Sequence, residues 1–195
     1  DLSCPNLYSM FGLENYQYTF ADNGLLLPPV CEGYHKGKQL KVFSLGADIP
    51  QGQYVAWTGT QLTDMLREQF ISIEWNGIDV LVIDMAPGTS DNAQTVLDFF
   101  PNATIVPVVL NQKLSLADGR KFIELCKHKK VNVTPCIINL SDVFSYYSNK
   151  EIYEMMRLKV MMHLPLNKEW AEEDAGLRML VNADKELARS FREVL

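Results

Sequence analysis

A loop with two carboxylates follows an apolar run near the middle of the chain and is the clearest candidate for chemistry. Residues 80–83 read Val-Leu-Val-Ile, and the next residues, 84–91, read Asp-Met-Ala-Pro-Gly-Thr-Ser-Asp. An aspartate at a strand end can hold the water shell of nucleotide-bound Mg²⁺, and a glycine behind it lets the backbone approach a ligand closely. The alternative role for Asp84 is an N-cap or a turn. The pattern favours a nucleotide site in which Asp84 holds Mg²⁺ through water.

Other apolar runs also end in polar residues. Asn111 follows residues 104–110, Asn139 follows residues 133–138, and Pro165 follows residues 160–164. Ligands of open α/β sheets bind beyond the carboxyl ends of the strands, so these residues are expected at one edge of one sheet. The amide of Asn139 could pair with the edge of an adenine, or it could cap its own loop.

The elements that must position these residues alternate between β-rich apolar runs and amphipathic helical patterns. This alternation predicts an α/β fold with a mostly parallel sheet and helices on both faces. Residues 1–39 look irregular and supply no first βα unit, and residues 1–195 read as a single domain. The capping-box pair Ser148 and Glu151 predicts the start of a further helix. The predicted strands cover residues 40–45, 80–83, 104–110, 133–138 and 160–164, and the predicted helices residues 62–73, 93–100, 116–126, 148–156 and 187–195.

Composition excludes several classes of protein. The 195 residues are 47% hydrophobic and 22% charged, which is typical of one globular domain. The net charge of -6 argues against a protein that coats nucleic acid or anionic lipid. No apolar run approaches the roughly 20 residues that span a bilayer. The four cysteines have no Cys-x-x-Cys spacing, so we expect a cytoplasmic protein without disulfides.

Signature motifs of other enzyme classes do not occur in these residues. There is no G-x-x-x-x-G-K-[ST], G-x-G-x-x-G, H-E-x-x-H or G-x-S-x-G sequence. Gly37-Lys38 precedes a predicted strand instead of a helix, so it is not a P-loop. His35, His128 and His163 are too scattered to indicate a zinc site.

The segment 79–91, together with Trp57-Thr58-Gly59, resembles the Mrp family of MinD-like P-loop ATPases. The resemblance extends along nearly the whole chain, through residues 5–13, 40–46, 138–141, 164–167 and 191–193. It implies a P-loop NTPase fold, ATP with Mg²⁺ as cofactor, and assembly of iron-sulfur clusters or other metallocofactors. The implied partners are a second copy or a related family member, and a metalloprotein client.

The resemblance also implies roles for individual residues. Asp84 corresponds to the Walker B residue, Asp91 to the switch beside the γ-phosphate, and Asp1 to the acidic residue that orients the attacking water, so these three form the catalytic set. We expect them to converge beyond the carboxyl edge of one parallel sheet, because strand-end residues of this class share a crevice. The remaining residues that it places in the nucleotide site are Gly88, Thr89, Asn139 and Pro165.

Two departures from the family pattern affect the expected activity. The family's P-loop has no counterpart in these residues, so we expect the 195 residues by themselves not to hydrolyse ATP at a typical rate. Either a P-loop is encoded upstream of Asp1, or the chain is a degenerate, non-hydrolysing member that acts as an assembly subunit. Residues 144–147 read Phe-Ser-Tyr-Tyr where cluster carriers place Cys-x-x-Cys, so we expect no cluster bridged at that point. The alternative hypothesis for an enzyme function is a nickel-insertion ATPase of hydrogenase maturation.

Overall fold

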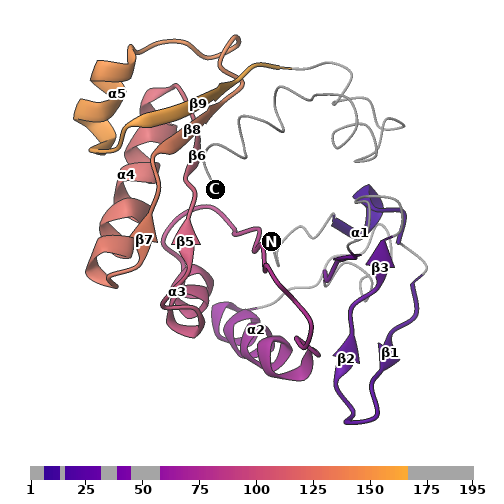
Figure 1. The fold of residues 1–195 in the computed structure, drawn as a ribbon. Helices are drawn as coiled ribbons and strands as arrows, with labels where there is room; N and C mark the ends of the chain where they lie inside the picture. Colours follow the sequence, from indigo (N-terminus) through magenta and orange to yellow (C-terminus); the bar gives the residue numbers. More distant parts are fainter. Residues whose placement is uncertain (1–6, 14–15, 32–38, 45–57, 167–195) are drawn as a thin grey trace. The chain divides into compact units, whose positions relative to one another are not determined.

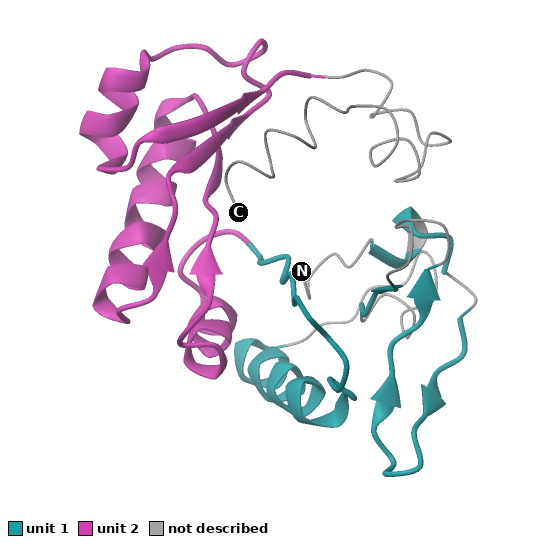
Figure 2. Ribbon diagram, in the orientation of Figure 1, with its two compact units in different colours: residues 1–86, 172–183 teal, residues 87–171, 184–195 magenta. Residues whose placement is uncertain are grey.

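The chain was analysed in a computed structural model that describes residues 7–13, 16–31, 39–44 and 58–166. It divides into two compact units, with the described residues up to Ala86 in the first and those from Pro87 in the second (Figure 2). The single domain expected from the sequence stays a prediction. No helix among the described residues is long and apolar enough to cross a membrane.

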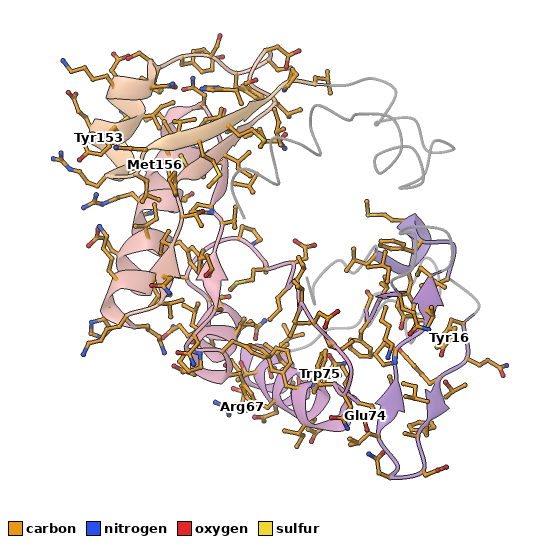
Figure 3. The ribbon with its side chains drawn as sticks, in the orientation of Figure 1. Tyr16, Arg67, Glu74, Trp75, Tyr153 and Met156 are labelled. Atoms are coloured by element: carbon orange, nitrogen blue, oxygen red, sulfur yellow. The ribbon has the colours of Figure 1, made fainter. Side chains whose placement is uncertain are left out.

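The first unit contains two short pairs of antiparallel strands and one long helix. Asn23 forms the turn of the hairpin β1–β2, where its Oδ1 accepts the Leu25 N–H at 3.0 Å. Glu74 ties this turn to the end of α2, because its carboxylate accepts from Asn23 Nδ2 at 2.7 Å and from the Asn76 N–H at 2.9 Å (Figure 3). The elements are α1 (Leu7–Met10), β1 (Thr19–Phe20), β2 (Leu26–Leu27), β3 (Val30–Cys31), β4 (Leu40–Lys41) and α2 (Gly59–Ser72).

Two of the predicted strands are wrong in this unit. The described part of the run at 40–45, residues 40–44, contains only the short strand β4, which pairs antiparallel with β3 instead of joining a parallel sheet. The run at 80–83 forms no strand, and Val80 and Val82 are 77% and 86% exposed. A strand needs the backbone of a neighbour for its hydrogen bonds. None of the strands in the described part of the chain pairs with these residues.

The second unit contains the parallel strands. β6, β8 and β9 form one sheet in that order, and β5 pairs with β7 (Figure 1). The predicted runs at 104–110 and 133–138 are each divided into two strands, and Pro107 and Pro135 lie at the divisions, where proline has no N–H to donate. The strand at 160–164 is confirmed. The elements are α3 (Asp91–Phe99), β5 (Thr104–Ile105), β6 (Val108–Leu110), α4 (Lys113–His128), β7 (Asn132–Val133), β8 (Cys136–Asn139), α5 (Asn149–Met156) and β9 (Val160–Leu164).

The core of this unit lies between the sheet and the helices α4 and α5. Met156 of α5 is fully buried against this core, whereas Tyr153 of the same helix is exposed (Figure 3). The described residues therefore give a helical layer on one face of the sheet, and the predicted helix at 187–195 lies outside them. The buried members of the cluster are Val109, Leu116, Ile123, Cys136, Ile138, Ile152 and Met156.

The predicted capping box at the start of α5 is confirmed. Ser148 Oγ accepts the Glu151 N–H at 3.3 Å, and the Glu151 carboxylate accepts the Ser148 N–H at 2.8 Å. The Ser148 hydroxyl, followed by the Ser148 backbone N–H, lowers the pKa of Glu151. The pair therefore satisfies backbone donors that the first turn of a helix leaves without partners.

We expect Ser148→Ala to lower the free energy of unfolding by about 1 kcal/mol, because the N-cap acceptor is lost. The depressed pKa of Glu151 means that its contribution is present above the ordinary glutamate pKa and is lost as the pH falls. The difference in free energy of unfolding between wild type and Ser148→Ala should therefore become smaller in acid. Urea unfolding at neutral and acidic pH measures both effects, with Ser145→Ala as the control in the preceding loop. Equal destabilisation by the two substitutions would contradict the role of the cap.

Candidate functional site

The residues with predicted catalytic roles lie in different parts of the structure. Asp84 is exposed and belongs to the first unit, whereas Gly88, Thr89 and Asp91 belong to the second unit. Asp1 lies outside the described residues. The convergence of Asp1, Asp84 and Asp91 at one sheet edge therefore stays a prediction.

The loop from Gly88 to Asp91 leads directly into helix α3. Gly88 has a φ of +90°, a left-handed conformation that glycine adopts without strain. Ser90 is the N-cap of α3 and its Oγ accepts the Ala93 N–H at 3.4 Å. The Gln94 side chain donates to the carbonyl of Thr89 at 3.4 Å. These contacts present Thr89 and Asp91 at a helix N-terminus, where the backbone dipole favours anionic groups such as phosphate.

Asn139 and Pro165 both lie at the carboxyl edge of the sheet β6–β8–β9. Asn139 ends β8 and is paired with Leu164, the last residue of β9 and the neighbour of Pro165. The Asn139 Oδ1 accepts the Leu140 N–H at 3.0 Å, and Leu140 has a left-handed φ of 49°. Asn139 therefore caps its own loop through its oxygen. Its amide nitrogen has no partner among the described residues and can donate to a ligand.

Asn111 is a structural contributor whose importance the sequence does not reveal. It directly follows β6, is 4% exposed, and its side-chain amide makes two hydrogen bonds with the backbone of Tyr147. Its Nδ2 donates to the Tyr147 carbonyl at 2.8 Å, and its Oδ1 accepts the Tyr147 N–H at 3.1 Å. The sequence marks Asn111 only as a polar residue after a strand, because its partner is 36 residues away. It fixes the far end of the loop that begins at Asn139.

Asp142, in the middle of the same loop, has no sequence signal at all. Its Oδ1 accepts the Leu166 N–H at 2.6 Å. The neighbouring Ser141 N–H donates to the Leu164 carbonyl at 2.9 Å. The loop from Leu140 to Tyr147 is therefore joined to both β6 and the end of β9.

The described thiols are poorly suited to bind a metal. Cys31, Cys126 and Cys136 are all buried, and burial raises the pKa of each thiol, which favours the neutral form over the thiolate that binds metal. Cys31 lies on β3 and not in the irregular segment that the sequence predicts, and Cys4 lies outside the described residues. No three His, Cys, Asp or Glu side chains gather into a metal site within the described ranges.

Comparison with solved structures first defines the class of fold. The chain superimposes over its full length on 76% of a nucleotide-binding protein from Archaeoglobus fulgidus, with a TM-score of 0.73 and 20% identity. That protein was solved in complex with ADP. This likeness confirms the predicted α/β fold.

Sequence comparison then gives the family. A family model described as ParA, NUBPL iron-transfer P-loop NTPase, matches residues 1–195, and the chain belongs to this family. An iron-sulfur cluster carrier protein of Pyrococcus furiosus is 25% identical over the whole chain and 71% of its own length. A cytosolic Fe-S cluster assembly factor, CFD1 of Kluyveromyces lactis, is 30% identical over 88% of the chain and 65% of its own length. The resemblance to Mrp-type P-loop ATPases is confirmed.

Proposed function

We propose that this protein binds ATP and takes part in the assembly of iron-sulfur clusters, which it passes to a metalloprotein client. The observation that carries the proposal is the family match over all 195 residues, which includes relatives named for cluster carriage and assembly. The cluster is the cargo of this function. A homodimer, or a complex with a related family member, is the proposed assembly.

The proposal gives roles to four residues of the loop 84–91. Asp84 holds Mg²⁺ through water, and Gly88, Thr89 and Asp91 lie beside the γ-phosphate. The geometry of the second group supports this role, since the loop ends at the capped N-terminus of α3. Bound Mg²⁺ would neutralise charge that develops on the phosphates during transfer. The residues proposed to hold the ion fit, because exposed carboxylate oxygens and water are the ligands that Mg²⁺ prefers.

The base is proposed to lie against the carboxyl edge of the sheet. Asn139 ends β8 and Pro165 directly follows the neighbouring strand β9, and the amide nitrogen of Asn139 can donate to an acceptor on the adenine ring. Asp1 is proposed to orient the attacking water if hydrolysis occurs. Hydrolysis itself requires a phosphate grip such as a P-loop, which is not found among these 195 residues.

The thiols of Cys31, Cys126 and Cys136 are not proposed as ligands of the cluster, which is proposed to be held by other thiols. Residues 144–147 contain no sulfur, and the buried Cys126 and Cys136 lie in the cores of the second unit. Hydroxyl groups do not replace thiolates as ligands of soft iron. The cluster therefore does not bridge two chains through this loop.

The test compares two aspartates that begin and end the same exposed segment. The complete gene product is loaded with a cluster under anaerobic conditions, and transfer to an apo-ferredoxin is followed by absorbance with and without ATP and Mg²⁺. We expect Asp84→Asn to reduce the ATP-dependent rate of cluster transfer by about 10–100-fold, because the amide binds the water molecules around Mg²⁺ more weakly than the carboxylate does. Asp79→Asn, five positions earlier, should leave the rate close to wild type.

Two results would contradict the proposal. Transfer at the same rate with and without ATP would favour the degenerate assembly subunit over the ATP-dependent protein. Equal losses in Asp79→Asn and Asp84→Asn would show that the segment responds to any change of charge, so that Asp84 has no specific role.

A further inference from the structure

The segment 164–166, which carries Pro165, is held in place by the preceding loop. Proline has no N–H, so it cannot donate to a neighbouring strand where β9 ends. The hydrogen bonds on either side of it come from consecutive residues of the loop: Ser141 donates to the Leu164 carbonyl at 2.9 Å, and Asp142 accepts the Leu166 N–H at 2.6 Å. These two bonds bracket Pro165.

The backbone that carries Asp142 is itself held by hydrogen bonds. The N–H groups of Val143 and Phe144 both donate to the Leu140 carbonyl, at 3.0 and 2.9 Å, which closes a tight turn around Asp142. Beyond this turn, the two bonds from Asn111 to Tyr147 fix the end of the loop on β6. The backbone on both sides of Asp142 is therefore held by hydrogen bonds.

The same loop begins at Asn139, the proposed base contact. Asn139 is paired with Leu164 across the sheet and lies three residues before Asp142. A hydrogen bond from a backbone N–H to an ionised carboxylate is about twice as strong as a bond between neutral groups. Asp142 therefore ties the segment 164–166 to the strand that carries Asn139.

We propose that Asp142 is a positioning residue for recognition of the nucleotide base. It keeps Pro165 at a fixed place beside Asn139, so that the two proposed base contacts act on one ring. Asp142 does not touch the base in this proposal, and it acts only through residues 164–166. The proposal rests on the proposed function, because it assumes that a nucleotide binds at this edge.

The test measures base selectivity, which a general loss of stability would not change. Binding of ADP and of GDP to the complete gene product is measured by calorimetry for wild type, Asp142→Ala and Asp142→Asn. We expect Asp142→Ala to reduce the preference for ADP over GDP by about tenfold, since a small displacement of a contact group has a large effect on recognition. Asp142→Asn retains an oxygen acceptor and should restore most of the preference. Asp118→Ala, an exposed aspartate on α4, is the matched control, and urea midpoints verify that each variant is folded.

The outcomes separate this inference from the proposed function. Wild-type protein that binds neither ADP nor GDP would overturn the proposed function and this inference with it. Wild-type protein that prefers ADP, with an unchanged preference in folded Asp142→Ala, would overturn the inference alone. An equal loss of preference in Asp118→Ala would also overturn it, because the effect would then be one of charge and not of position.

Discussion

Leu116→Ala is expected to lower the free energy of unfolding by about 2–5 kcal/mol, the largest effect on stability that we predict. Leu116 lies on α4 and is 0% exposed, in the cluster where α4 and α5 pack on the sheet. Truncation removes apolar surface from this core and leaves a cavity that the surrounding strands can fill only in part.

The matched control is on the same helix. Leu114 is two residues earlier and 76% exposed, so Leu114→Ala removes the same atoms from solvent-exposed surface. We expect Leu114→Ala to change the free energy of unfolding by no more than about 0.5 kcal/mol. Urea unfolding followed by circular dichroism measures both variants. Similar losses for the two substitutions would contradict the assignment of the core.

Asn111→Ala is expected to lower the free energy of unfolding by about 1–3 kcal/mol, because the backbone N–H and carbonyl of Tyr147 both lose their side-chain partner. Asn111→Asp should cost more at neutral pH. The new carboxylate still accepts from the Tyr147 N–H, but it cannot donate to the Tyr147 carbonyl, and it places a charge at a buried position.

The pH dependence of Asn111→Asp follows from the same geometry. Burial raises the pKa of a carboxyl group above its unfolded value, so the protonated form is favoured in the folded state. That form can donate and accept as asparagine does, and its contribution to stability is present at low pH and lost as the pH rises through the raised pKa. The loss of free energy of unfolding in Asn111→Asp, relative to wild type, should therefore become smaller in acid. The loss in Asn111→Ala should not change with pH. The exposed Asn132→Ala serves as the control, and a deficit in Asn111→Asp that does not change with pH would contradict the two-sided contact.

Local sequence determined the helices α2 to α5, whereas the four-residue helix α1 lies in residues 1–39, where the sequence predicts no regular element. The capping box at Ser148 and Glu151 predicts the start of α5, and the structure begins the helix at Asn149. The basic residues Lys127 and His128 lie in the last turn of α4, as the helix dipole favours. These features depend on contacts between residues three or four positions apart, so the sequence carries them directly.

The tertiary structure decided which apolar runs became strands and which polar residues support the candidate site. The run at 80–83 is as apolar as β9, yet only β9 has a neighbouring strand among the described residues. Asn111 bonds to a residue 36 positions away and Asp142 to one 24 positions away, so neither contact leaves a periodic pattern in the sequence. A strand, or a contact between loops, exists only when the fold brings a distant backbone to it, and that pairing is not encoded in any short window of residues.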